Sequence, residues 1–359
     1  MYSTEALSTL AHWFAARHAP GQRTTIRKVS YPAIGFSAST ILLDITAGGM
    51  DHSLVIRVPN ERYPVFLDST MIRQVQMMQA LRRYGVPVPE VLDWNEDPAM
   101  MDGPFLVMKR CDGEHLPAHP SYRVEGFLHT LSDTGRDRAW RSAVKGIAQI
   151  NRVRWQRDFG FLMTPAYGEA GLDHYLGWLR AWRKAASSDA HLIIDAGLEH
   201  LARHKPTSSH ADLLWGDSNP CNFLFSPKGE ASTLLDFEAA SIGPAEIDLA
   251  WWFFMDEMLS AGNPPPSGTP GRDAQILTYE ETLGRAVSNL EYYEVLAAVR
   301  MSLVVLQTTQ RLIDAGRLPA NNDAALANPA CFMLARMIGI QAAAPGIDYM
   351  TMVGEASKR

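Results

Sequence analysis

Between residues 24 and 60, short apolar and β-branched runs are separated by turn residues, and this pattern predicts a small antiparallel meander. The predicted strands are Thr24–Val29, Thr40–Ile45 and Ser53–Val58. Before them, apolar residues recur at three- and four-residue steps from Leu7 to Phe14. Ser3 or Thr4 can cap that segment, so we predict a helix over residues 4–18.

After the meander the period changes to that of a helix. Residues 68–84 carry apolar side chains at helical spacing, and Gly85 ends the segment before two prolines. A further strand is predicted at Phe105–Lys109. From residue 121 to about residue 204 the pattern is mostly helical. The sequence therefore predicts an α+β protein with a sheet-rich lobe at residues 1–108 and a larger helical lobe at residues 109–359.

One hairpin interrupts the helical lobe. A short apolar run ends at Trp215, a loop follows, and Phe223–Phe225 is a predicted strand. The residues Ser-Pro-Lys-Gly at 226–229 suit a tight turn, after which Ser232–Phe237 returns. The hairpin places Asp217 and Asn222 before its first strand and Asp236 at the end of its second. We expect three oxygen-bearing side chains to converge at one end.

Composition and charge narrow the class of protein. The 359 residues are enough for two domains, and 47% of them are hydrophobic, so a sizeable core is expected. The net charge of −6 argues against a protein that binds nucleic acid through its phosphates. Three widely spaced cysteines fit neither a zinc knuckle nor a disulfide scaffold. We find no signal peptide and no membrane span, and we expect a cytoplasmic protein whose oligomeric state stays open.

The hairpin residues suit phosphoryl transfer from a nucleotide. That reaction needs a carboxylate at the attacking hydroxyl and oxygen ligands for the magnesium ion that bridges the phosphates. Asp217 and Asn222 lie five residues apart in one loop, and Asp236 returns 14 residues after Asn222. The alternative is structural, because aspartate and asparagine often only bond loop backbone or end a strand.

Several ordered motifs resemble the aminoglycoside phosphotransferase family, whose members have a kinase-like fold. In the helical lobe they are WGDSNPCN at 215–222, LDFE at 235–238 and GPAEIDLA at 243–250. In the first lobe, GVPVP at 85–89, EDP at 96–98 and GPFLVM at 103–108 resemble the subgroup that is fused to some acyl-CoA dehydrogenases. The resemblance covers roughly residues 25–310. It implies a bilobal protein-kinase-like fold, with ATP between the lobes and a small hydroxyl-bearing acceptor on the helical lobe.

The resemblance also implies a role for particular residues. Asp217 becomes the catalytic base, or the group that orients the acceptor hydroxyl, and Asn222 and Asp236 become ligands of Mg²⁺. In the first lobe, Arg57 stands where most kinases carry a phosphate-binding lysine, and its fork can still bind phosphate. The remaining implied nucleotide contacts are Gly35 and Ser37 in the turn over the phosphates, and Met108 in the hinge segment Val107–Lys109 beside adenine.

Two further acidic residues of these motifs, Glu238 and Asp248, are less specific signs of function. Glu238 would point the same way as Asp236 if the strand continues, and it either touches the metal ion or makes a structural hydrogen bond. Asp248 is expected to cap a helix from Leu249 onward and to brace the loop around Asp217.

Two departures from the family pattern leave two functions open. Gln74 stands where a glutamate would pair with the strand cation, and Trp215 replaces the usual histidine before Gly-Asp. We expect Gln74 to hydrogen-bond Arg57 in the ATP-bound state. The first hypothesis is an ATP- and Mg²⁺-dependent O-phosphotransferase, and the alternative is a catalytically silent module that binds nucleotide or a partner. For the acceptor, a hydroxylated acyl or lipid-like metabolite ranks slightly above an aminoglycoside.

Overall fold

The computed structural model describes residues 2–32, 38–59, 64–207, 210–260 and 262–356. Its N-terminal part is built on a five-stranded antiparallel sheet with the strand order β1-β2-β3-β5-β4. The strands are β1 (Thr24–Ser30), β2 (Ala38–Ala47), β3 (Met50–Pro59), β4 (Val91–Asn95) and β5 (Phe105–Lys109). The predicted meander and the strand at 105–109 are confirmed, whereas β4 was not predicted.

Two helices flank this sheet, and they belong to different cores. In α1 (Thr4–His18) the Ser3 hydroxyl accepts a hydrogen bond from the backbone N–H of Ala6, so Ser3 is the N-cap. The buried face of α1 packs with the sheet residues. The other helix, α2 (Met71–Arg83), instead contributes Met71, Val75 and Leu81 to a core that it shares with the C-terminal part. This helix therefore links the two parts of the molecule.

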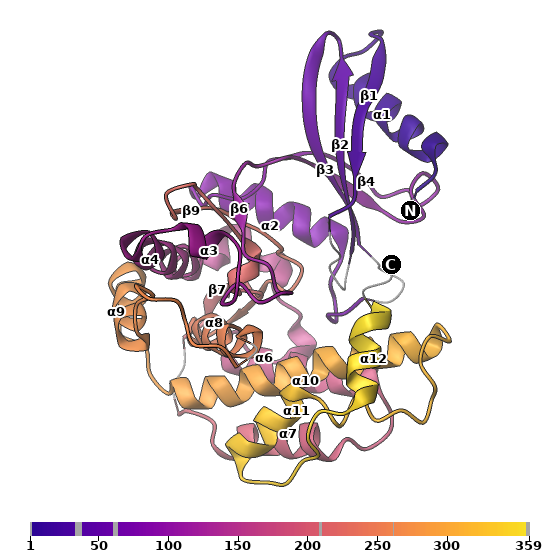
Figure 1. Ribbon diagram of the computed structural model, residues 1–359. Coiled ribbons are helices and arrows are strands. Elements are labelled where there is room, and N and C mark those ends of the chain that lie inside the picture. The colour runs from indigo at the N-terminus through magenta and orange to yellow at the C-terminus, as the bar shows by residue number, and fades with distance from the viewer. Residues whose placement is uncertain (1, 33–37, 60–63, 208–209, 261, 357–359) are drawn as a thin grey trace.

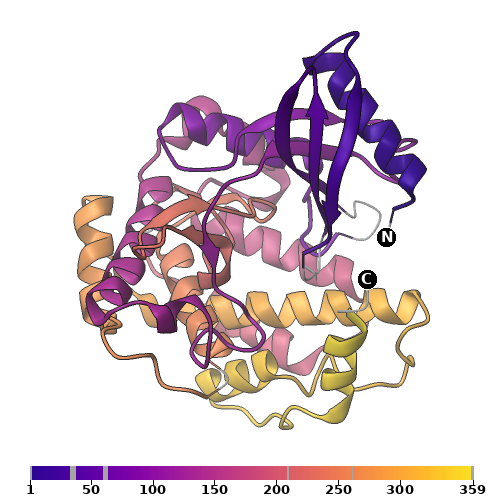
Figure 2. The same ribbon diagram turned by 45° about the horizontal axis from the view of Figure 1, so that its top comes forward.

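The C-terminal part is mostly helical, as the sequence predicts (Figures 1 and 2). Its longer helices are α4 (Asp133–Asn151), α6 (Leu172–Ala186), α7 (Leu192–Arg203), α8 (Glu246–Leu259), α9 (Arg272–Leu283), α10 (Leu290–Asp314), α11 (Pro329–Ile338) and α12 (Ile347–Ala356). Shorter turns of helix are α3 (Phe127–Thr130), α5 (Trp155–Asp158), η1 (Gly160–Leu162), η2 (Pro165–Tyr167) and η3 (Pro220–Asn222). The core around α10 includes residues of α6, α7, α8 and α11.

Two small sheets lie within the helical part. One pairs β7 (Asp212–Leu214) with β10 (Ser241–Gly243), and the other has the order β6-β8-β9, from β6 (Glu114–His115), β8 (Phe223–Phe225) and β9 (Ala231–Leu234). The predicted hairpin is β8 and β9. However, β9 ends at Leu234, and Asp236 follows it with a left-handed backbone (φ 59°). The prediction that the second strand of the hairpin extends to Asp236 is therefore wrong.

The α+β class with a small antiparallel-sheet part and a larger helical part is confirmed. The lobe boundary after Met108 stays a prediction, and this position falls inside β5. Across the described residues, we find no helix whose length and apolar content would let it cross a membrane.

Candidate functional site

The loop that carries Asp217, residues 215–222 (the Asp217 loop), starts directly after β7. Gly216 has a positive φ of 89°, and a Cβ atom there would lie 2.0 Å from the carbonyl oxygen of Ala239. Both conditions require glycine at this position. Real Cβ atoms do not approach a carbonyl oxygen so closely, and the left-handed region favours glycine. The turn at Gly216 thus fixes the direction in which the loop leaves the sheet.

Asp248, in the first turn of α8, hydrogen-bonds the start of this loop. Its fully buried carboxylate accepts hydrogen bonds from the backbone N–H groups of Trp215 (2.8 Å) and Gly216 (2.9 Å) and from Nδ2 of Asn151 (2.7 Å). Its backbone carbonyl accepts from the Ser218 hydroxyl. The predicted bracing role is confirmed, but α8 begins at Glu246, so Asp248 does not cap a helix that starts at Leu249.

The Asp217 carboxylate is oriented by three donors. Oδ1 accepts from Trp251 Nε1 (2.8 Å) and Asn219 Nδ2 (3.0 Å), and Oδ2 accepts from Asn222 Nδ2 (2.7 Å). Burial raises the pKa of Asp217, Arg300 opposes that rise and Asp236 adds to it. A carboxylate with a raised pKa and a fixed orientation has the properties of a proton acceptor.

Asn222 and Asp236 supply the oxygen atoms of a possible cation site. Because Nδ2 of Asn222 faces Asp217, its Oδ1 is the atom left for a cation. Oδ1 of Asp236 is buried and makes no hydrogen bond among the described residues, but it lies 3.2 Å from Nη1 of Arg57 in an ion pair. Amide and carboxylate oxygens are the donors that Mg²⁺ prefers. No group of three or more histidine, cysteine, aspartate or glutamate side chains in the described ranges could hold a metal ion.

Arg57 reaches Asp236 from the other part of the molecule. Arg57 belongs to strand β3, and each of its two terminal nitrogens lies 3.2 Å from one carboxylate oxygen of Asp236. Burial opposes the charge on Arg57, but the carboxylates of Asp236 and Glu238 outweigh burial and raise the pKa of Arg57. The structure therefore brings together the predicted phosphate-binding cation and a predicted metal ligand.

Trp215 replaces the family's usual histidine as a brace for the residues before Asp236. Its single indole N–H is shared between the carbonyl oxygens of Leu235 and Asp236, both at 2.9 Å. The indole is fully buried and packs edge-on against Phe223. The indole N–H thus connects the Asp217 loop to Leu235 and Asp236. Trp215 can therefore brace the loop in place of the histidine that the family resemblance implies.

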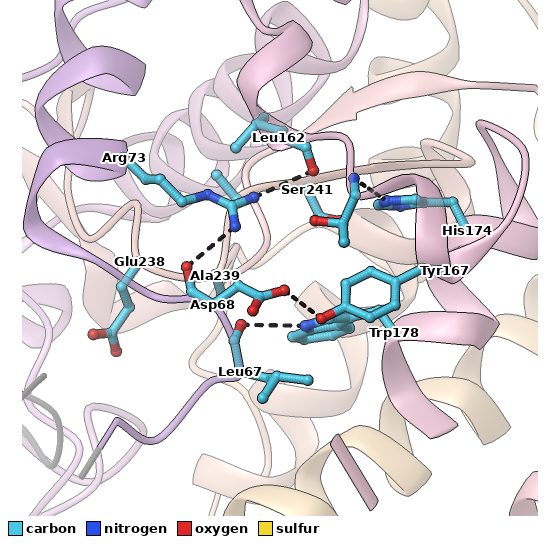
Figure 3. A pocket seen from close by; sticks show the side chains of 12 residues that line it. Leu67, Asp68, Arg73, Leu162, Tyr167, His174, Trp178, Glu238, Ala239 and Ser241 are labelled. Atoms are coloured by element: carbon cyan, nitrogen blue, oxygen red, sulfur yellow. Dashed lines mark hydrogen bonds between the residues drawn. The ribbon is translucent and has the colours of Figure 1, made fainter. Parts of the chain in front are cut away.

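Gln74 makes no hydrogen bond to Arg57 among the described residues. The side chain is 2% exposed, and its Nε2 has no hydrogen-bond partner among the residues described. The neighbouring Arg73 holds the start of α2 instead, because its guanidinium donates to the carbonyl oxygens of Asp68 (3.1 Å) and Leu162 (3.2 Å) (Figure 3). Arg73 therefore joins the start of α2 to Leu162 of the C-terminal part.

The Arg73 contacts line a small polar cavity of about 20 Å³ beside the Asp236 segment. On its other side, the hydroxyl of Tyr167 donates to Asp68 (2.5 Å), and the indole of Trp178 donates to the carbonyl of Leu67 (3.2 Å) (Figure 3). Glu238 also lines this cavity. The volume accommodates about one water molecule, so the cavity leaves no room for an acceptor.

The other predicted nucleotide contacts are less defined. Met108 lies in β5, is 6% exposed, and pairs with Val55 and Val91 on the neighbouring strands. Its position beside an adenine ring stays a prediction. Gly35 and Ser37 lie outside the described residues.

Sequence reasoning missed three residues of the site. Asn219 and Trp251 both bond Asp217, and Arg300 of α10 donates to the carbonyl oxygen of Gly216. The available signal for Arg300 was a charge inside the largely apolar helical segment 292–306. Trp251 lies in the apolar run 249–255, where nothing in the pattern separates a site residue from a core residue.

A known protein family and a curated protein are similar to this chain in sequence. The model of the phosphotransferase enzyme family matches residues 28–284. Acyl-CoA dehydrogenase family member 10 of Mus musculus is 28% identical over 183 residues, which are 50% of this chain and 16% of that protein. The chain thus spans a small part of that curated relative.

Solved structures show the same fold at low sequence identity. A Ralstonia eutropha protein with the provisional description aminoglycoside phosphotransferase superposes with a TM-score of 0.66 at 19% identity, covering 99% of both chains. The GDP complex of aminoglycoside 2'-phosphotransferase-IIIa gives 0.58 at 13% identity, again over 99% of both chains. The fold is therefore the bilobal, kinase-like one that the sequence motifs imply. With a family match over most of its length, this chain belongs to the phosphotransferase enzyme family.

Proposed function

We propose that this protein is an ATP- and Mg²⁺-dependent kinase that transfers the γ-phosphoryl group to a hydroxyl of a small molecule. The observation that carries the proposal is the fixed Asp217 carboxylate, which three side-chain donors orient. Asp236 and Arg57 pair with each other and both interact electrostatically with Asp217, which supports roles as a metal ligand and a phosphate-binding cation. Family membership supports the reaction class.

In this proposal each residue has one task. Asp217 orients the acceptor hydroxyl and takes its proton as the oxygen–phosphorus bond forms and ADP leaves. Arg57 holds phosphate oxygens through its guanidinium fork. Asn222 Oδ1 and the Asp236 carboxylate would hold Mg²⁺, which neutralises phosphate charge when bound. Trp215 and Asp248 act indirectly, because they fix the positions of the two loops.

The direct test is phosphate transfer by the purified protein. We expect slow ATP hydrolysis with Mg²⁺, and an Asp217→Asn variant that binds ATP normally but has lost activity by roughly three orders of magnitude. GTP should be run in parallel, because a similar structure was solved with GDP. An Asp217→Asn variant as active as the wild type would remove Asp217 from the reaction.

A catalytically silent nucleotide-binding module is the second candidate. The Arg57–Asp236 ion pair favours it, because the pair occupies both groups that MgATP needs, and Gln74 offers Arg57 no carboxylate in exchange. ATP binding without turnover on any acceptor of a broad hydroxyl panel would support the module. Turnover that disappears with Asp217→Asn would exclude it.

For the acceptor, we infer a hydroxylated acyl or lipid-like metabolite ahead of an aminoglycoside. The support is the curated relative, whose name places a related segment in a protein of the acyl-CoA dehydrogenase family. The test is acceptor-stimulated release of ADP with hydroxyacyl-CoAs, aminoglycosides and choline-like alcohols. A response to aminoglycosides alone would reverse this ranking and leave the phosphotransferase proposal intact.

A further inference from the structure

Arg300 is a charged side chain at the centre of the helical part. It lies on α10, is 0% exposed, and is among the largest fully buried side chains of the described residues. One terminal nitrogen donates to the carbonyl oxygen of Gly216, directly before Asp217. The guanidinium carbon lies 4.0 Å from the centre of the Trp251 ring and 5.2 Å from that of Phe66.

These contacts converge on Asp217 by two routes. Through the carbonyl of Gly216, Arg300 holds the backbone immediately before Asp217. Through the face of Trp251, it holds the indole whose Nε1 donates to Asp217 Oδ1 at 2.8 Å. A guanidinium over an aromatic face is attractive, and more so when both groups are desolvated. The Arg300 guanidinium thus contacts both the backbone before Asp217 and the indole that donates to the Asp217 carboxylate.

The burial of Arg300 is costly, and packing alone does not require it. In the described part of the chain, no carboxylate lies within ion-pair distance of Arg300, although its positive charge attracts the buried carboxylates of Asp217 and Asp248. Its Nε and Nη2 atoms have no hydrogen-bond partner among the described residues. Burying a guanidinium with no carboxylate at ion-pair distance is unfavourable, because the charge loses its hydration. Leu296 and Leu303 of the same helix fill their core positions without that cost. An arginine at this position therefore contributes something other than hydrophobic burial.

We propose that Arg300 is a positioning residue that aims Asp217 at the acceptor hydroxyl, an inference that rests on the proposed phosphotransferase function. Arg300 acts from behind the loop: it locks the carbonyl of Gly216 and the ring of Trp251, and these two fix the Asp217 carboxylate. In the proposed function, ATP binds through Arg57 and Asp236. Loss of Arg300 therefore lowers kcat and leaves the KM for ATP nearly unchanged.

The test compares Arg300→Met, Arg300→Lys and a matched control, Arg183→Met. Arg183 is 8% exposed on α6, where it pairs with Asp195 at 2.7 Å and donates to backbone carbonyls away from the Asp217 loop. We expect Arg300→Met to lower kcat on the order of 10- to 100-fold, with the KM for ATP within about twofold. Arg300→Lys should recover part of kcat, because an ammonium can still bond the Gly216 carbonyl. Arg183→Met should lower the melting temperature and keep kcat per folded molecule.

A second readout does not depend on activity. Trp251 emission, taken as the difference between each protein and its Trp251→Phe counterpart, should shift in Arg300→Met and stay unchanged in Arg183→Met. If the wild type transfers no phosphate, the proposed function fails, and the emission arm alone decides whether Arg300 positions Trp251. If the wild type is active, wild-type kcat in folded Arg300→Met overturns the inference. If Arg300→Met does not fold, Arg300→Lys takes its place. Wild-type kcat together with unshifted Trp251 emission in Arg300→Lys would then overturn the inference.

Discussion

The guanidinium of Arg57 and the carboxylate of Asp236 form a two-point ion pair at 3.2 Å, although 179 positions separate them in the chain. One residue comes from β3 of the N-terminal sheet and the other follows β9 in the helical part. In the proposed reaction each has a different ligand, phosphate for Arg57 and Mg²⁺ for Asp236. In the proposed function, the two groups that pair with each other here are those that bind the phosphates and Mg²⁺.

The first prediction separates the two proposed metal ligands. Asp236→Ala should lower activity more than Asn222→Ala, because a carboxylate neutralises a divalent cation and an amide contributes only a dipole. The measurement is the Mg²⁺ concentration for half-maximal activity, which should rise further in Asp236→Ala. An unaltered magnesium titration in Asp236→Ala would remove this residue from the site.

The second prediction concerns Arg57 and Gln74. Arg57→Ala should weaken ATP binding roughly 10- to 100-fold, the usual range for losing charged hydrogen bonds. If Gln74 orients Arg57 in the ATP-bound state, Gln74→Ala should also weaken binding, by a smaller factor. Gln74→Glu should offset part of the attraction between Arg57 and the phosphates. Calorimetric titration with ATP checks all three, and wild-type affinity in Arg57→Ala would reject both assignments.

The third prediction tests the brace beneath the Asp217 loop. Asp248→Asn should lower the free energy of unfolding by about 3 kcal/mol, because one oxygen acceptor for buried N–H donors becomes an NH₂ group. It should also lower kcat, since the donors include the backbone of Trp215 and Gly216. The matched control is Asp93→Asn, a buried aspartate that pairs with Arg17 in the N-terminal part. The control should lose stability but keep kcat; equal kcat losses in both variants would contradict the bracing role.

The fourth prediction is a pH dependence of stability. His191 is 4% exposed, its Nδ1 accepts from the backbone N–H of Ile194 at the start of α7, and burial lowers its pKa. The unfolded chain then binds more protons than the folded one below pH ~6.5, so the stability that His191 contributes above that pH is lost as the pH falls. Asn is also a good N-cap, so His191→Asn should keep the cap and lessen the loss. Denaturant unfolding at pH 7.5 and 5.5 measures this difference, and identical pH slopes would refute the prediction.

Local patterns in the sequence determined the elements and the family. The helix at residues 4–18, the strand at 105–109 and the hairpin strand at 223–225 agree with the structure. Each depends on residues that are neighbours in the chain, such as a cap, a turn or an apolar period. The motif around Asp217 likewise predicted the family, because its members lie close together in the sequence.

Contacts between distant segments were decided only by the tertiary structure. The pairing of Arg57 with Gln74 in the ATP-bound state stays a prediction, whereas the pairing of Arg57 with Asp236 and the bond from Arg73 to Leu162 emerged only from the structure. The left-handed backbone of Asp236 was absent from any local pattern, and a charge within an apolar helical segment did not reveal what the buried guanidinium of Arg300 contacts. Partner choice in a core depends on which elements pack together and how much water they exclude. Those conditions arise only once β3, α2 and α10 are in place, so no spacing along the chain encodes them.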